Sequence, residues 1–401
     1  MELKKIHISD IGKIVTGKTP RTSVAENYDG YIPFLTPSDD LSHESAPKTT
    51  KTLTEQGLNE VRNCLLPSRS ICVSCIGSDL GKVVMTKEPT VTNQQFNSII
   101  PNKNFNADFV YYFMTLVGRE LNYLSKTSTA VPIINKSSFS NYEIEVPDLE
   151  TQNRIASILS SIDSKIELNR RINDNLEQQA QALFKSWFVD FEPFRGGEFV
   201  DSELGLIPKG WRVVSLGEVT KQITEKVGNR EDVTVLSPIN SGELVLSEEY
   251  FTKQVFSKDL SKYLIVNPLS FAYNPARINI GSIGLNTFDF VGCVSPVYVV
   301  FECEPNYQYF FDFFKRTAMF KDEVALRAIG GVRQSLGYND LSLIKTIYPT
   351  SDVVVEFNNL YLKMKEVMIK NTDQNEKFIS LRDSLLPKLM SGELKINEFN
   401  C

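Results

Sequence analysis

The chain of 401 residues has only two histidines, His7 and His43. A Ser-His-Asp hydrolase or a histidine-rich metal site would have to be built from these two residues, so both are disfavoured. Runs of about 18 apolar residues, which would cross a membrane, are also missing. The opening MELKKIHISD lacks the apolar segment of a signal peptide. We therefore expect a soluble, cytoplasmic protein of two to three domains.

A surplus of positive charge is missing too. The chain has 43 Lys and Arg against 49 Asp and Glu, a net charge of −6, and no segment is a polycation. This balance argues against a nucleic-acid-binding protein that works unaided, because phosphate neutralisation would have to come from local patches or from a partner. The six cysteines are too few for a disulfide framework in a chain this long, so we expect them to be packing residues in a reducing compartment.

One motif suggests a nucleotide site. Gly12–Thr19 has the spelling G-x-x-x-x-G-K-T of a phosphate-binding loop. Such a loop leads directly into a helix, whereas Thr19 is followed by Pro20, which disfavours helical backbone at Thr19. We therefore interpret residues 17–21 as a small basic turn, which could equally hold a DNA phosphate.

Other catalytic motifs are incomplete. Cys72 and Cys75 form a lone C-x-x-C, and zinc needs about four ligands. The stretches 274–277 (NPAR) and 295–298 (SPVY) are only faintly similar to the N-P-P-Y loops of amino-methyltransferases, because each lacks the second proline. No strand leads into a glycine-rich dinucleotide turn. The sequence therefore predicts a chain without a catalytic site, metal or cofactor of its own.

The sequence repeats itself once, with a period of about 200 residues. The stretch 4–11 is echoed by 212–219, with apolar residues at matching positions. Further on, Ile76-Gly77-Ser78 recurs as Ile280-Gly281-Ser282. Small differences in offset are expected from loop insertions. The repeat predicts two similar domains.

Each half ends in a long helical segment. Apolar residues at alternating steps of four and three continue over more than four heptads in both, with polar residues in the middle. We expect a central spacer helix at 150–195, with Thr151 as its N-cap, and a distal helix at 351–390 that is stopped or kinked at Pro387, followed by a tail at 391–401. Two such helices should pair with each other; the alternative is that each packs only on its own domain. The expected seam residues are Ile155, Leu159, Ile162, Ile166, Asn169, Leu176 and Leu183 in the first helix and Phe357, Leu360, Met364, Val367, Asn371, Phe378 and Leu385 in the second.

The regions 1–149 and 196–350 mix short β-type runs with turns and a few helical stretches, which predicts two compact α+β domains. Their loops carry polar and basic side chains that can contact phosphates or base edges. We expect these loops to face DNA; the alternative is local capping and solvation. The expected DNA-contacting residues are Lys18, Thr19, Arg21, Lys82, Asn93, Gln94, Gln95, Lys126 and Thr127 in the first domain and Asn274, Arg277, Asn279, Arg333 and Gln334 in the second.

An aromatic run lies where the first helix ends. We expect its members to pack in a core, and the alternative is docking of a partner subunit. The run consists of Trp187, Phe188, Phe191, Phe194 and Phe199.

Five stretches, most of them in the helical segments, are similar to a known family: 152–156 (QNRIA), 163–169 (DSKIELN), 183–191 (LFKSWFVDF), 210–211 (GW) and 382–394 (RDSLLPKLMSGEL). With them the chain resembles the specificity subunits of type I restriction-modification systems. It implies an α+β protein with two target recognition domains, related by a pseudo-two-fold repeat and joined by an antiparallel coiled coil.

The resemblance also implies a function. The chain would be non-catalytic and would read a bipartite target in double-stranded DNA, one half-site per domain. Its partners would be two modification subunits, which use S-adenosylmethionine to methylate adenine N6, and restriction subunits, which use ATP and Mg to cleave DNA. These cofactors would belong to the partners. The remaining alternatives are a stand-alone methyltransferase or P-loop ATPase and a coiled-coil scaffold without DNA binding.

Overall fold

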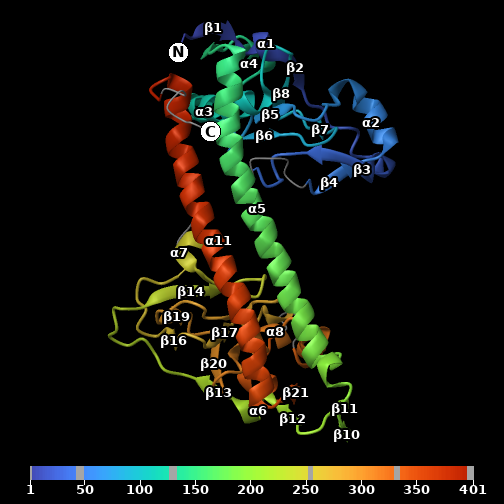
Figure 1. Cartoon of the computed structure of the whole chain (residues 1–401), viewed down its shortest axis with the longest axis vertical. Helices are drawn as coiled ribbons and strands as arrows, with labels where there is room; N and C mark the ends of the chain where they lie inside the picture. Colours follow the sequence, from blue (N-terminus) through green and yellow to red (C-terminus); the bar gives the residue numbers. More distant parts are fainter. Residues whose placement is uncertain (1, 42–48, 126–132, 252–255, 329–334, 395–401) are drawn as a thin grey trace. The chain divides into compact units, whose positions relative to one another are not determined.

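The computed structural model describes residues 2–41, 49–125, 133–251, 256–328 and 335–394. The chain divides into two compact units (Figure 1). Unit 1 consists of Met1–Arg170 with Asn371–Cys401, and unit 2 of Arg171–Lys370. Each unit combines an α/β domain with part of two long helices, α5 (Leu149–Phe188) and α11 (Ser351–Ser391). None of the helices in the described ranges has the length and apolar character needed to span a membrane.

The domain of unit 1 contains two main sheets. An antiparallel sheet has the order β2-β8-β5-β6, and a mixed sheet has the order β4-β3-β7. The strands are β2 (Gly12–Thr16), β8 (Phe96–Pro101), β5 (Ile71–Ser74), β6 (Val83–Met85), β4 (Lys51–Leu53), β3 (Tyr28–Leu35) and β7 (Val91–Thr92), and β1 (Lys4–His7) pairs with β9 (Glu143–Val146). The helices are α1 (Ile8–Ile11), α2 (Glu55–Val61), α3 (Ala107–Ser125) and α4 (Lys136–Ser140), with short 3-10 turns η1 (Ala25–Asn27) and η2 (Arg62–Cys64).

The domain of unit 2 repeats the antiparallel sheet, and its mixed sheet has one strand more than that of unit 1 in the described ranges. Its antiparallel sheet has the order β13-β20-β17-β18, and its mixed sheet has the order β15-β14-β19-β16. The strands are β13 (Thr220–Ile223), β20 (Val299–Cys303), β17 (Phe271–Tyr273), β18 (Ile283–Leu285), β15 (Leu244–Leu246), β14 (Thr234–Pro238), β19 (Gly292–Val294) and β16 (Leu264–Val266), and β12 (Arg212–Ser215) pairs with β21 (Lys345–Tyr348). The helices are α6 (Leu216–Val219), α7 (Ser247–Tyr250), α8 (Gln308–Phe314), α9 (Ala318–Arg327) and α10 (Tyr338–Leu341), with the turn η4 (Ile278–Ile280). Between α5 and β12 lie η3 (Glu192–Phe194) and the hairpin of β10 (Phe199–Ser202) and β11 (Gly205–Pro208).

The shared strand order confirms the internal repeat, but one correspondence inferred from the sequence was wrong. The β5–β6 and β17–β18 hairpins each have a glycine of positive φ two residues before the second strand, Gly81 with 89° and Gly281 with 96°. Gly281 therefore corresponds to Gly81 and not to Gly77. A three-letter match is too short to fix an alignment, whereas a hairpin fixes where its left-handed residue must stand.

The ends of the long helices differ from the sequence expectation. Asp148 caps α5, because its Oδ1 accepts a hydrogen bond from the backbone N of Thr151 at 2.8 Å, so Thr151 is not the cap. Helix α11 does not stop at Pro387 but continues to Ser391, and Gly392 follows it with a φ of 75°. The last turn is held by burial of its apolar side chains in the core of unit 1, and the left-handed glycine then ends the helix.

In unit 1, α5 and α11 pair in antiparallel orientation. Arg382 contacts Asp163, while further along α5 Asn169 contacts Asn375. On α5, the expected seam residues Ile155, Leu159 and Ile166 are fully or almost fully buried. The helices therefore pair with each other while they also pack on the domain core.

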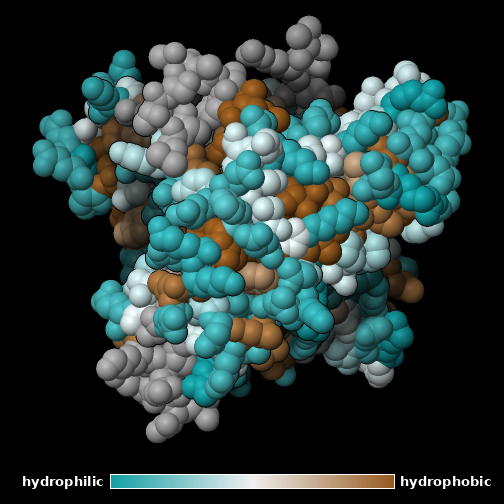
Figure 2. Space-filling model, turned by 90° about the horizontal axis from the view of Figure 1, so that it is seen from above, coloured by the Kyte–Doolittle hydropathy of each residue, from teal (hydrophilic) through white to brown (hydrophobic). Residues whose placement is uncertain are grey.

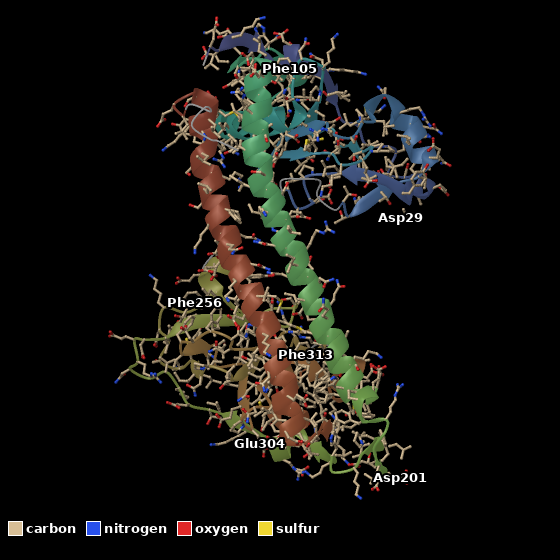
Figure 3. All side chains as sticks on the ribbon, in the orientation of Figure 1. Asp29, Phe105, Asp201, Phe256, Glu304 and Phe313 are labelled. Carbon is tan, nitrogen blue, oxygen red and sulfur yellow. The ribbon has the colours of Figure 1, made fainter. Side chains whose placement is uncertain are left out.

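In unit 2, α11 packs against both α5 and α8. The Phe357 ring lies 5.8 Å from that of Phe184 on α5 and 5.5 Å from that of Phe313 on α8, which lies beside α11 in Figure 3. Because α8 also packs on α11, the buried face of α11 is turned toward α8. The predicted seam is therefore wrong at two positions, since Leu360 and Val367 are 36% and 43% exposed.

The remaining seam residues lie between these extremes. Asn169 is buried, and the other positions are partly buried. These partly buried residues are Ile162, Leu176 and Leu183 on α5 and Met364, Asn371, Phe378 and Leu385 on α11.

The aromatic run after α5 packs in the core of unit 2. The rings of Phe188, Phe191 and Phe194 lie 5.0–5.9 Å from Trp211. This arrangement supports core packing rather than docking of a partner at this run.

On the face shown in Figure 2, hydrophilic and hydrophobic residues are interspersed.

Candidate nucleic-acid interface

In unit 1, three loops leave the same end of the sheet β2-β8-β5-β6. Thr16 at the end of β2 pairs with Asn97, and Ser74 at the end of β5 pairs with Phe96. The loops that follow β2 and β5 and the loop that precedes β8 therefore emerge together. We call residues 17–21, 75–82 and 93–95 the readout end of unit 1. The seven described residues of the first domain that the sequence singled out for DNA contact all lie in these loops.

Direct contacts join two of these loops. The backbone N of Lys18 donates to the carbonyl O of Thr92 at 2.9 Å. The Thr19 hydroxyl donates to Oε1 of Gln94 at 2.7 Å. The structure thus brings Lys18, Thr19 and Gln94 together.

Gly17 permits this close approach, and the same geometry excludes a phosphate-binding loop. A Cβ at Gly17 would lie 2.1 Å from the carbonyl O of Asn93. No helix follows Thr19: the next helical turn is η1 at Ala25. In addition, the backbone N–H of Lys18 already donates to the carbonyl O of Thr92 at the end of β7, so it does not point at a bound phosphate.

Asn93 and Gln95 hold the second loop in shape. The amide Nδ2 of Asn93 donates to Oε1 of Gln95 at 2.9 Å, and Oδ1 of Asn93 accepts from the backbone N of Gln95 at 3.1 Å. Asn93 is only 8% exposed. Its amide is therefore engaged in the loop, and the exposed Gln94 between the two is better placed to meet a base.

The basic side chains of this end differ in their freedom. Arg21 is committed to Glu60 on α2, since Nε and Nη2 donate to Oε1 at 2.9 and 2.7 Å. The hydrogen bonds from Arg21 lower the pKa of Glu60 to about 2. Lys18 and Lys82 are exposed, and neither forms an ion pair within the described ranges. The two lysines are therefore available to DNA phosphates, whereas Arg21 first stabilises the domain.

Unit 2 has an equivalent readout end. Tyr273 at the end of β17 pairs with Val299 at the start of β20, so the loop after β17 and the loop before β20 adjoin. We call residues 274–282 and 295–298 the readout end of unit 2. It contains Asn274, Arg277 and Asn279.

The side chains of this loop are placed by short-range contacts. Oδ1 of Asn274 accepts from the backbone N of Ala276 at 3.0 Å, which engages this amide in the turn. Arg277 stands at the start of η4 and is exposed, as is Asn279. The four other residues expected to contact DNA lie outside the described residues: Lys126, Thr127, Arg333 and Gln334.

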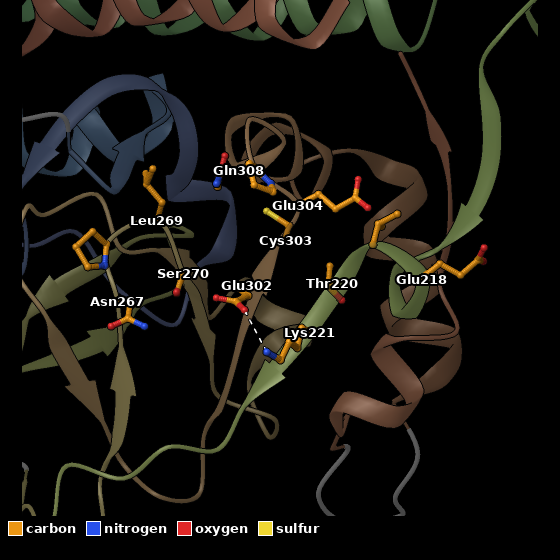
Figure 4. Close-up of a pocket in the computed structure, with 13 residues that line it drawn as sticks. Glu218, Thr220, Lys221, Asn267, Leu269, Ser270, Glu302, Cys303, Glu304 and Gln308 are labelled. Atoms are coloured by element: carbon orange, nitrogen blue, oxygen red, sulfur yellow. Dashed lines mark ion pairs between the residues drawn. The ribbon is translucent and has the colours of Figure 1, made fainter. Parts of the chain in front are cut away.

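The opposite end of the unit 2 sheet has a different character. A groove of about 530 Å³ lies there, where Thr220 pairs with Cys303. Figure 4 shows Glu218, Glu302 and Glu304 among its lining residues. The basic Lys221 lies 3.9 Å from Glu302. Because the lining is acidic, it would repel phosphate groups.

The cysteine pair of unit 1 is part of the core. Cys72 lies within β5 and Cys75 follows it, and burial raises their pKa values to about 12 and 11. Both thiols therefore stay protonated at neutral pH, whereas zinc binds thiolates. Within the described ranges, no three His, Cys, Asp or Glu residues are grouped so that they could hold a metal ion.

Comparison with known proteins adds the family. Residues 1–178 match the family model of the type I restriction modification DNA specificity domain. Over 413 aligned residues the chain is 29% identical to the type I restriction enzyme MjaIX specificity subunit of Methanocaldococcus jannaschii, covering 99% of this chain and 94% of that protein. It is 35% identical over 173 residues to the HindI specificity subunit of Haemophilus influenzae, covering 42% of this chain and 38% of that protein.

The fold is similar to a solved structure of the same kind. The crystal structure of a type I restriction-modification system S subunit from M. genitalium aligns with a TM-score of 0.55 and 15% identity, over 97% of this chain and 96% of that chain. This likeness supports the fold expected from the sequence, two similar α+β domains joined by long paired helices. Residues 1–178 thus match the specificity domain, and almost the whole chain is similar to a specificity subunit of a type I restriction enzyme.

Proposed function

We propose that this chain is a specificity subunit of a type I restriction-modification system and that it reads a DNA target of two half-sites, one with each domain. The observation that carries the proposal is the duplicated readout end. In each unit, those residues singled out for DNA contact that the structure describes emerge at the same end of a sheet with the same strand order. Exposed side chains there have the chemistry for direct readout. Gln94 can bond adenine N6 and N7 and Arg277 can bond guanine O6 and N7, in the way that bidentate side chains distinguish base pairs in the major groove.

We propose further that α5 and α11 set the distance between the half-sites. A helix extends by about 1.5 Å per residue, so a helix of 40 or 41 residues can serve as a ruler. In other DNA-binding proteins, the separation of two reading modules likewise dictates half-site spacing. The buried hydrogen-bonded asparagines of the helix pair support this role, because polar residues in a coiled-coil seam fix its register.

Specificity subunits do not catalyse; methylation and cleavage in type I systems reside in partner subunits. We propose two modification subunits, which bring S-adenosylmethionine and methylate adenine N6, and restriction subunits, which bring ATP and Mg. With a net charge of −6 and few free cations at the readout ends, this chain by itself should bind DNA weakly. The partners would supply much of the attraction to phosphates, while this chain supplies the sequence preference.

The direct test is methylome sequencing of cells that carry the chain with its modification subunits. The proposal predicts methylated adenines in one split motif, with two defined half-sites and an unspecified spacer between them. The matched control is the same cells without this chain, in which the motif should be unmethylated. Methylation without any motif would contradict the proposal and would favour a scaffold.

A second experiment addresses the enzyme alternatives. The purified chain is titrated with labelled S-adenosylmethionine and with ATP. We expect no stoichiometric binding of either. The first five residues of the G-x-x-x-x-G-K-T stretch form strand β2, and the next helical turn after Thr19 begins at Ala25. Stoichiometric binding of ATP or S-adenosylmethionine would instead point to a catalytic chain.

A further inference from the structure

The readout end of unit 2 displays two apolar side chains to solvent. Ile280 is 51% exposed and Val297 is 71% exposed. They come from different loops, which the pairing of Tyr273 with Val299 brings to the same end of the sheet. Burial of an apolar side chain lowers the free energy, so the exposure of two such side chains at one end of the sheet costs stability in the unbound chain. A binding partner that covers them would recover this free energy.

The local backbone places Ile280 beside Arg277. The backbone N of Ile280 donates to the carbonyl O of Arg277 at 3.1 Å, which closes the 3-10 turn η4. Arg277 is the N-cap of this turn and Ile280 is its last residue, so both belong to one short loop segment. Between them Ile278 is 4% exposed and anchors the turn in the core of unit 2. The turn thus presents a cation and an apolar group together.

The second loop presents Val297 through a turn of its own. The backbone N of Tyr298 donates to the carbonyl O of Ser295 at 2.9 Å, which leaves Pro296 and Val297 at the tip. Val297 is therefore not needed for packing within the unit. Both apolar groups are held on anchored turns and do not have to be ordered when they bind, which lowers the cost of binding.

In the major groove, the one apolar group that a base pair offers is the C5-methyl group of thymine. Arg277 lies in the same loop as Ile280, is exposed and forms no ion pair within the described ranges, so its charge matches a DNA partner. We propose that Ile280 and Val297 contact the methyl group of a thymine in the half-site read by unit 2. This inference rests on the proposed function, and it adds a chemical group that the domain selects.

The test uses the complex of this chain with its modification subunits and a duplex that carries its methylation motif. Each thymine of the motif is replaced in turn by deoxyuridine, which removes only the C5-methyl group. We expect one replacement, in one half-site, to raise Kd about fourfold, the effect of burying roughly one methylene. The double variant I280A/V297A should bind the thymine and deoxyuridine duplexes equally.

The control variant is Leu343→Ala, which truncates a side chain that is 56% exposed in unit 2, between α10 and β21 and outside the readout end. It should keep the preference for thymine. Equal binding of the two duplexes by the unchanged complex would overturn the inference, as would a preference that survives in I280A/V297A. If I280A/V297A fails to assemble with the modification subunits while L343A assembles, the apolar pair is a protein contact, and the inference is again overturned.

The outcomes of this test can be distinguished from those that test the proposed function. If methylome sequencing finds no split motif, the proposed function is contradicted, and no duplex for the binding test can be designed. A split motif whose binding ignores the thymine methyl groups would contradict only the role of Ile280 and Val297.

Discussion

Two asparagines in the helix pair of unit 1 yield a quantitative prediction. Asn169 and Asn375 are 9% and 8% exposed, and they bond each other: Nδ2 of Asn169 donates to Oδ1 of Asn375 at 3.0 Å. Nδ2 of Asn375 donates to the carbonyl O of Ile166 at 3.3 Å, and Gln374 offers Asn169 a second acceptor at 3.3 Å. The pair is thus satisfied as a unit, and removing one member leaves polar groups buried without their partner.

The expected changes in the free energy of unfolding differ between removing one asparagine and replacing both. Asn375→Leu should lower the free energy of unfolding by about 2 kcal/mol, because it leaves the Asn169 amide with only the long bond to Gln374. The double variant N169L/N375L should lie within about 1 kcal/mol of the original chain or above it, because apolar residues can replace both partners of a buried polar pair at little cost. The two changes should therefore couple by about 1–3 kcal/mol in a double-mutant cycle.

The assay is urea unfolding of the chain followed by far-UV circular dichroism, with N169L, N375L and the double variant measured together. Glu376→Ala, a neighbouring exposed position on α11, is the control and should change stability by less than about 0.5 kcal/mol. Additive losses in the double variant would refute the reasoning, because they would mean that each asparagine acts without the other.

Three more predictions concern the domain of unit 1. Hydrogen bonds from Arg21 lower the pKa of Glu60 from 4.5 to about 2, so their contribution to stability is present above pH 4.5 and is lost as the pH falls toward 2. Acid unfolding of the Glu60→Gln variant, followed by circular dichroism, should lack this part of the pH dependence. Lys18→Ala should weaken DNA binding by the complex for every sequence and make the slope of log K against log salt shallower by about one unit, whereas an unchanged slope in a salt titration would remove Lys18 from the phosphate contacts. Gly17→Ala should abolish recognition of one half-site, because its Cβ would lie 2.1 Å from the carbonyl O of Asn93; methylome sequencing that finds both half-sites intact would contradict this.

Much of the architecture could be predicted because local sequence patterns determine it. The echo of 4–11 at 212–219 marks β1 with α1 and β12 with α6, which the structure shows at equivalent places in the two units. The seam of α5 was predictable at Ile155 and Leu159, since the apolar side chains needed on that face recur at the heptad spacing.

The errors arise where distant residues decide the outcome. The buried face of α11 is turned by the aromatic side chains of α8, which no heptad pattern within α11 records. Arg21 looked like a free cation, but Glu60, far away in the sequence, engages it. Asn93 looked like a base reader because its residue type fits adenine, yet its amide is bonded to Gln95. Residue type indicates a capacity for contact, and only the fold shows whether that capacity is already used.

The central claim is that duplicated readers are separated by a helical ruler. The most direct measurement is methylome sequencing after removal of one heptad from within 162–176 and one from within 360–374, which keeps the helix faces in phase. We predict the same two half-sites with a different spacer between them. Altered half-sites, or an unchanged spacer in a complex that still methylates DNA, would contradict the account.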